Sequence, residues 1–148
     1  MNNRLIKMII DHICIAVKKL DEAISYWDRV FGYKQMTEVA ENSLQKVKVV
    51  FLYKKDSLTI KLIEPFADND AMMNFVKGGG GFHHVCFKCD NLDEQVREFT
   101  KEGLLTLSQP QPGEAFNGHN IAFMLAKYGL RIELIDTEEK AGLLPGLT

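Results

Sequence analysis

Residues 11–17 read Asp11-His12-Ile13-Cys14-Ile15-Ala16-Val17, and this stretch decides the fold because a related one recurs. The recurrence is His84-Val85-Cys86-Phe87, whose histidine lies 72 residues after His12. The same offset relates Leu20-Asp21-Glu22 to Leu92-Asp93-Glu94, Phe51 to Phe123, Leu58 to Leu130, and Ile60, Leu62 and Ile63 to Ile132, Leu134 and Ile135. The matches include His, Cys and Leu-Asp-Glu, so shared strand periodicity alone explains them less well than a duplication.

Each copy is predicted to fold as a strand, a helix and three further strands. In the first copy, alternating residues predict a strand over 9–17, and helical spacing predicts a helix over 21–32 that ends at Gly32. The following segments are predicted as strands at 33–39, 47–53 and 58–63, with a polar loop at 40–45. The second copy is predicted as a strand at 83–89, a helix from 92 to 103, strands at 104–107, 121–125 and 130–135, and a loop at 109–118.

The chain is predicted to be one α+β domain over residues 1–148, made of two tandem βαβββ modules. Module one covers about 9–65, a linker helix and glycine run 66–81, module two about 82–136, and a tail 137–148, whose weak periodicity predicts fraying. Each module is too small to bury its own sheet. We therefore expect the two sheets to pair into one barrel-like cup.

Composition excludes several classes of function. The net charge is −2 and the pI about 6.1, so no basic surface for nucleic acid is expected. Apolar runs are too short to span a bilayer, which predicts no membrane partner. Three cysteines without framework spacing favour a reducing cytoplasm. Cys86 and Cys89 form a C-x-x-C spacing inside a strand, where they face opposite ways, so buried thiols are expected instead of a zinc site.

Four equivalent positions are predicted to face the interior of the cup. His12 and His84 lie on the faces of their strands that point away from the helices. Glu133 alternates with Leu130, Ile132 and Leu134, which face the helices, and its counterpart in module one is Lys61.

His12, His84 and Glu133 together make a 2-His-1-carboxylate set, which is typical of a metal site with open positions for substrate. A single histidine on a strand is more often structural, so the joint placement carries this prediction. Protonated Lys61 is a poor ligand, because it has no lone pair. It either neutralises Glu133 so that no metal binds, or acts on substrate as an anion-binding group or acid–base, or lies exposed at an edge.

The chain resembles the vicinal oxygen chelate superfamily of glyoxalases, bleomycin-resistance proteins and dioxygenases, from about Ile9 to Asp136. Within it the sequence most resembles methylmalonyl-CoA epimerases. The matching stretches are residues 11–17, Ile63-Glu64-Pro65, Gly81-Phe82-His83-His84-Val85, Gln111-Pro112-Gly113 and Ile132-Glu133-Leu134. The resemblance implies a divalent metal ion (Co, Mn, Ni, Zn or Fe) held by His12, His84 and Glu133, and a homodimer.

The resemblance implies an isomerase, epimerase or lyase that acts through a metal-chelated enolate, with Glu133 or Lys61 moving the proton. The expected substrate is an acyl-CoA or another compound with vicinal oxygens. The chain departs from the epimerase pattern at Lys61, where Gln or Glu is usual, at Val49, where some epimerases have a second catalytic Glu, and in the short loop 126–129. The alternatives are an Fe(II) dioxygenase of the extradiol type and a metal-free protein that binds a small molecule.

Overall fold

The structure is a computed structural model that describes residues 7–147; residues 1–6 and 148 of the predicted domain lie outside it. Its elements, in chain order, are β1 (Ile9–Ala16), α1 (Leu20–Phe31), β2 (Lys34–Gln35), β3 (Ala40–Asn42), β4 (Val47–Tyr53), β5 (Thr59–Pro65), α2 (Asp70–Lys77), β6 (Gly81–Lys88), α3 (Leu92–Lys101), β7 (Leu105–Pro112), the 3₁₀ helix η2 (Glu114–Phe116), β8 (Asn120–Leu125), the 3₁₀ helix η3 (Lys127–Gly129) and β9 (Arg131–Ile135).

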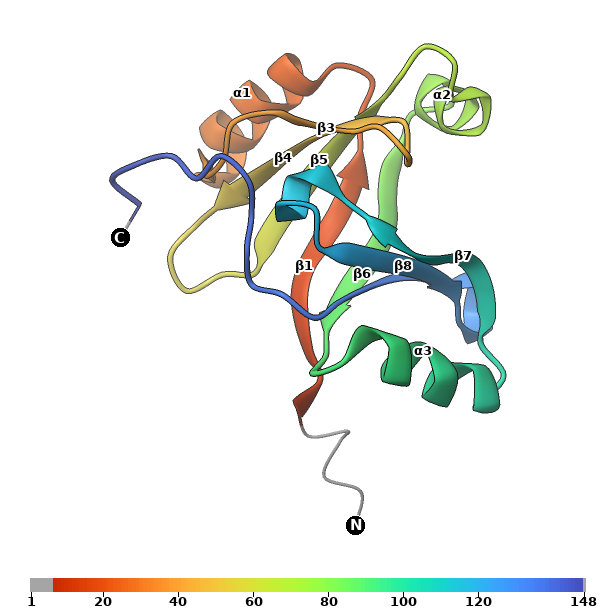
Figure 1. Ribbon diagram of the computed structural model, residues 1–148. Helices are drawn as coiled ribbons and strands as arrows, with labels where there is room; N and C mark the ends of the chain where they lie inside the picture. Colours follow the sequence, from red (N-terminus) through yellow and green to blue (C-terminus); the bar gives the residue numbers. More distant parts are fainter. Residues whose placement is uncertain (1–6, 148) are drawn as a thin grey trace.

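The strands form one curved sheet in the order β2-β4-β5-β1-β6-β9-β8-β7, and β3 pairs with a separate part of β4 (Figure 1). In each module the first strand pairs in parallel with the last, β1 with β5 and β6 with β9. The two modules meet where β1 and β6 pair antiparallel in the middle of the sheet. The predicted α+β class is confirmed, and the modules pair within one chain.

The register of the sheet follows the 72-residue offset. Cys14 lies opposite Lys61 across β1 and β5, and their counterparts Cys86 and Glu133 lie opposite each other across β6 and β9. The two modules are therefore related by an approximate twofold axis through the β1–β6 pair. The axis brings equivalent residues of the two copies to the middle of the sheet.

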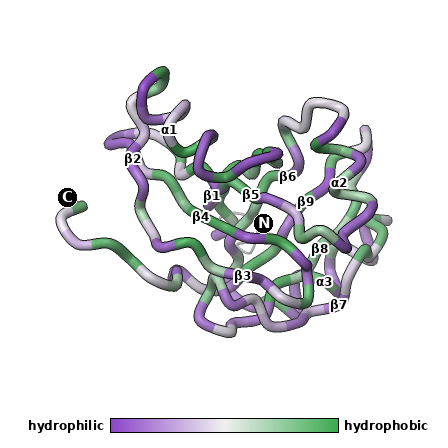
Figure 2. The backbone as a smooth tube through the Cα atoms, turned by 90° about the horizontal axis from the view of Figure 1, so that it is seen from above, coloured by the Kyte–Doolittle hydropathy of each residue, from purple (hydrophilic) through white to green (hydrophobic). Residues whose placement is uncertain are grey.

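Helices α1 and α3 cover the outer face of the sheet, and the inner face encloses a separate core to which α2 contributes Val76. On the outside, α1 packs over β4 and β5, and α3 packs over β8 and β9. The inner core contains buried side chains from both modules and from η2, among them Cys14, Phe51, Cys86 and Phe116. Figure 2 shows the strands curving around this interior when the molecule is seen from above. The helices of residues 7–147 are all too short or too polar to cross a membrane.

The beginnings of the two outer helices are built alike. The Leu20 amide of α1 donates to the Glu64 carboxylate at 2.8 Å, and the Leu92 amide of α3 donates to Asp136 at 2.9 Å. Glu64 and Asp136 are themselves 72 residues apart. α1 ends at Gly32 as predicted, because the chain turns there with φ of 75°, which glycine adopts without strain.

Several predicted segments differ in the structure because tertiary pairing overrides the local pattern. The predicted strand at 33–39 is only two residues long in β2, and the predicted loop at 40–45 begins with β3. The predicted strand at 104–107 continues as β7 to Pro112, into the predicted loop. β7 is an edge strand with two breaks in its register, where prolines are tolerated.

The tail is held in place over residues 137–147, so the prediction that it frays is wrong there. The Glu38 amide donates to the Gly142 carbonyl at 2.8 Å, and the Leu144 amide donates to that of Met36 at 2.9 Å. The Ala141 amide also donates to the Ala115 carbonyl of η2 at 2.9 Å. These bonds fasten the tail to both modules across the open side of the sheet (Figure 1).

Candidate functional site

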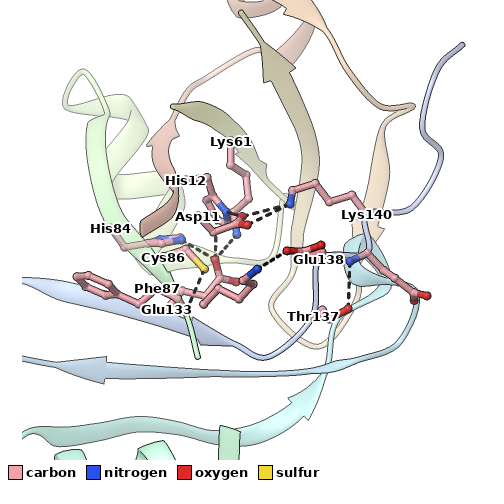
Figure 3. A network of polar contacts seen from close by, with 12 residues as sticks. Asp11, His12, Lys61, His84, Cys86, Phe87, Glu133, Thr137, Glu138 and Lys140 are labelled. Atoms are coloured by element: carbon pink, nitrogen blue, oxygen red, sulfur yellow. Dashed lines mark hydrogen bonds and ion pairs between the residues drawn. The ribbon is translucent and has the colours of Figure 1, made fainter. Parts of the chain in front are cut away.

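The four predicted inward positions meet at one point between β1, β5, β6 and β9. His12, Lys61, His84 and Glu133 are all buried, and their side chains point toward one another (Figure 3). The structure thus brings together the four residues that occupy the equivalent inward positions of the two modules. Their roles as ligands or catalytic groups stay predictions.

One carboxylate oxygen is the centre of the cluster. Glu133 Oε1 lies 2.8 Å from Lys61 Nζ, 2.9 Å from His12 Nε2 and 3.1 Å from His84 Nε2. The other oxygen, Oε2, is buried and has no hydrogen-bond partner among residues 7–147. A buried carboxylate oxygen without a partner is costly, which marks this atom as one that a ligand, an ion or a transferred proton can satisfy.

The charges of the cluster follow from its burial and its contacts. Burial alone would raise the pKa of Glu133, but the Lys61 ammonium and the histidine hydrogen bonds hold that pKa well below its ordinary value. Burial would lower the pKa of Lys61, but the Glu133 carboxylate keeps it above its ordinary value. Burial and the Lys61 charge lower the pKa of His84 to about 3. At neutral pH the cluster therefore contains an ammonium, a carboxylate and a neutral His84.

Two partners of the histidines lie at β-bulges. In the β1–β6 ladder, Ile10 pairs with Phe87 and His12 with Cys86, so Asp11 is an extra residue. Asp11 Oδ2 consequently lies 2.7 Å from His12 Nδ1, and Lys140 of the tail lies 3.2 Å from the same Asp11 oxygen. The bulge turns Asp11 toward the site from a position that strand alternation assigns to the other face.

The equivalent bulge on β6 falls at His83, 72 residues after Asp11. His83 Nδ1 lies 2.7 Å from His84 Nδ1, and Arg131 Nη1 lies 2.9 Å from His83 Nε2. Burial and the Arg131 charge lower the pKa of His83 to about 4, so it is neutral at pH 7. Alternation could have suggested Arg131, which shares a strand face with Glu133, but not His83.

A cavity of about 360 Å³ opens beside the cluster. Lys61 and His84 form part of its wall, together with His83 and Arg131. Gln45 also lines it, and neither atom of its buried amide group has a hydrogen-bond partner among residues 7–147. A second cavity of about 480 Å³ shares Met72, His83 and Arg131 with the first and lies along α2. Together the two cavities have room for one end of a small molecule and for part of its remaining length.

The three cysteines are buried free thiols, as predicted. Burial raises the pKa of Cys14 to about 12 and that of Cys89 to about 11, and it raises that of Cys86 well above its ordinary value. These thiols are therefore protonated and unreactive at neutral pH. Val49 is buried in the inner core, so β4 contributes no carboxylate at that position.

The donor atoms of the cluster fit a metal ion in part. The ligand atoms of His12, His84 and Glu133 all lie within 4.8 Å of one another, and their types suit a divalent ion. Lys61 does not fit, because its ammonium lies 2.8 Å from the oxygen that a metal would share. The part of the chain that the structure describes thus has a group able to hold a metal, with a cation of its own beside it. A bound divalent ion stays a prediction.

Comparison with known proteins agrees with this architecture. The model of the Glyoxalase/Bleomycin resistance protein/Dioxygenase superfamily matches residues 11–123. Protein YqjC of Bacillus subtilis is 32% identical over 130 residues, which are 86% of this chain and 91% of that protein. Mitochondrial methylmalonyl-CoA epimerase of Mus musculus is 30% identical over 101 residues, which are 67% of this chain but only 56% of the enzyme.

Solved structures of similar fold include members of the same enzyme group. A methylmalonyl-CoA epimerase variant from Streptomyces coelicolor, solved in complex with 2-nitronate-propionyl-CoA, superposes with a TM-score of 0.76 at 26% identity. The superposition covers 93% of this chain and 98% of that structure. The duplicated modules, the family match over most of the chain and these relatives lead to one conclusion. The chain belongs to the Glyoxalase/Bleomycin resistance protein/Dioxygenase superfamily.

Proposed function

We propose that this chain is an isomerase of the epimerase type, which moves the proton on the carbon next to a carbonyl group through an enolate. The observation that carries the proposal is the Lys61 ammonium at the wall of the cavity, with Glu133 directly behind it at 2.8 Å. The similarity to methylmalonyl-CoA epimerases from mouse and Streptomyces coelicolor supports the same reaction class.

Removal of an α proton places negative charge on the carbonyl oxygen, and the site would stabilise that charge. Lys61 lies at the cavity wall with a fixed positive charge, so a carbonyl oxygen placed against it gains more as an enolate than as a ketone or thioester. The low exposure of the site strengthens this interaction, because little water screens it. Lys61 is thus assigned the role of stabilising the enolate oxygen.

Glu133 is assigned the role of proton acceptor. Its Oε2 has no hydrogen-bond partner among the described residues, whereas Oε1 is engaged by Lys61 and both histidines. Glu133 is buried behind Lys61 and does not line the cavity, so the α carbon would have to enter between Lys61 and His84 to reach Oε2. The α proton would then pass to Oε2 as the C–H bond breaks, and the electron pair of that bond would form the enolate. Return of the proton from Oε2 to the same face gives the starting compound. The epimer forms when the enolate turns its other face toward Oε2 before the proton returns.

The proposed substrate is an acyl-CoA or a similar carbonyl compound with a second oxygen group. The Arg131 guanidinium and the unpaired Gln45 amide both line the cavity beside Lys61, so they can bind a carboxylate or amide oxygen of the acyl part. The second cavity, along α2, provides space for the more distant part of such a molecule. The methylmalonyl-CoA epimerases among the relatives are named for an acyl-CoA, which agrees with a substrate that extends from the first cavity into the second.

Deuterium exchange tests the proposal without knowledge of the stereochemistry. The protein is incubated in D₂O with methylmalonyl-CoA and with other acyl-CoA or α-hydroxycarbonyl compounds, and wash-in at the α carbon is followed by NMR. We expect exchange that falls by at least about 100-fold in Glu133→Gln and Lys61→Met. Lys48→Gln, which changes an outlying lysine on β4, is the control and keeps the activity. Absence of exchange with every compound would refute the proposal.

A metal-free binding protein is the second candidate. The observation that favours it is Val49, which leaves the inner core without a second carboxylate for proton transfer at that position. Tight binding of an acyl-CoA without deuterium exchange would support this alternative. The dioxygenase alternative requires oxygen uptake with catechol-like diols after iron loading. The homodimer and the cytoplasmic location also stay predictions.

A further inference from the structure

We propose that the Lys61 ammonium takes the place of the metal ion in this member of the superfamily. The positive charge at the centre of the site would then belong to the chain itself. Of the three predicted ligands, Glu133 would hold this ammonium directly, and His12 and His84 would hold the Glu133 carboxylate in place. The part of this inference that concerns catalysis rests on the proposed function, whereas the part that concerns metal binding does not.

The Lys61 ammonium is enclosed by partners on two sides. Lys61 Nζ lies 2.8 Å from Glu133 Oε1, and its side chain is only 3% exposed. On another side, Nζ lies 5.5 Å from the centre of the buried Phe116 ring, a distance typical of a cation–π contact. A divalent ion bound to Glu133 Oε1 would be adjacent to this ammonium and strongly repelled by it. Occupation by lysine and occupation by metal therefore exclude each other.

The hydrogen bonds that run from Arg131 through His83 also favour the tautomer of His84 that cannot bind a metal through Nε2. Arg131 can only donate, so His83 accepts at Nε2 and carries its proton on Nδ1. That proton is donated to His84 Nδ1 at 2.7 Å, which leaves the proton of neutral His84 on Nε2. His84 consequently presents an N–H group to Glu133 at 3.1 Å, and not the lone pair that a metal needs.

His12 differs from His84 in this respect. Both of its neighbours, Asp11 at 2.7 Å and Glu133 at 2.9 Å, are carboxylates that accept hydrogen bonds. Asp11 would accept the Nδ1 proton, as a carboxylate next to a metal-bound histidine does. The Nδ1 partner of His12 therefore favours the tautomer whose Nε2 lone pair could bind a metal, whereas the Nδ1 partner of His84 favours the opposite tautomer. The residues at the two bulges set this difference. Asp11 accepts a hydrogen bond from His12, whereas His83, at the equivalent position, donates one to His84.

Metal analysis of variants tests the proposal. Wild-type protein, Lys61→Gln and Lys61→Gln/Arg131→Met are freed of metal with a chelator, and binding of Co²⁺ and Zn²⁺ is measured by calorimetry, elemental analysis and the Co²⁺ absorption spectrum. Glutamine in place of the lysine would offer a neutral oxygen, and loss of Arg131 frees His84 to present its lone pair. Lys48→Gln is the matched control, because it removes a lysine charge outside the site.

We expect no stoichiometric binding to the wild type or to the control, and about one ion per chain in the double variant. The double variant should bind about 10–100-fold more tightly than Lys61→Gln alone, because an outer hydrogen-bond partner affects affinity by that factor. Stoichiometric metal in the wild type that is lost in His12→Ala would overturn the proposal. Natively folded variants, judged by circular dichroism, that both bind no metal would also overturn it.

The same samples separate this inference from the proposed function. Deuterium exchange by the wild type should be unchanged by EDTA, because the ammonium cannot be chelated. Exchange that EDTA abolishes and Co²⁺ restores would refute the role of Lys61 and leave the isomerase proposal in place. Absence of exchange in all conditions would refute the isomerase proposal and leave the metal measurements unaffected.

Discussion

Replacement of Lys61 by methionine should destabilise the protein by leaving the Glu133 carboxylate buried without its counter-ion. The two side chains are 3% and 0% exposed, and their charged atoms lie 2.8 Å apart. With an effective dielectric constant of about 20, charges at this distance attract by about 6 kcal/mol. Desolvation offsets part of that attraction in the wild type, so removal of one partner is expected to cost about 3–5 kcal/mol.

Urea unfolding followed by the fluorescence of Trp27, the single tryptophan, measures this change. Chelator is present throughout, so that metal cannot stabilise a variant. The double variant Lys61→Met/Glu133→Gln should recover more than half of the loss, because glutamine keeps an oxygen for the histidines without a charge. Lys48→Met, which breaks a partly exposed pair at 3.8 Å with Glu64, should cost less than about 1 kcal/mol. A loss below about 1 kcal/mol for Lys61→Met would refute the reasoning.

Two further predictions concern the backbone and the thiols. Gly80→Ala should lower the free energy of unfolding by at least about 2 kcal/mol, because φ is +66° and a Cβ would lie 2.4 Å from the Ala16 carbonyl oxygen. Gly118→Ala, where φ is +82° and a Cβ has open space, should cost only about 1–2 kcal/mol in the same urea unfolding experiment. Cys14 and Cys86 should react with a thiol reagent at pH 8 only after denaturation, because both are buried and Cys14 has a pKa of about 12; rapid labelling of the native protein would contradict this.

The arrangement of the inner face could be predicted because two regularities act together. Strand alternation assigns His12 and Glu133 to the inside, and the 72-residue offset adds Lys61 and His84 at equivalent positions. Neither regularity depends on distant contacts. The need of two small sheets to share one core predicts that the modules pair. It does not predict which strands join them, and the structure joins them through β1 and β6.

The partners of the site residues could not be predicted in the same way. Asp11 and His83 lie at bulges, and a bulge reverses the face that alternation assigns. The effect of Lys140 depends on the tail crossing to Asp11, a contact that joins residues 129 positions apart. The extent of β7 depends on its pairing with β8, since the prolines of β7 argue locally against a strand.

The approximate twofold axis has a consequence for the origin of the Lys61–Glu133 pair. These residues occupy equivalent positions of the two modules, so in a symmetric dimer of identical single modules they would be the same residue. Such a dimer could place lysine against lysine or glutamate against glutamate, and both arrangements repel. Only a chain that contains both copies can change one and keep the other. The buried ion pair at the centre of this site is thus a product of broken symmetry, available to the fused protein and closed to a symmetric assembly of its halves.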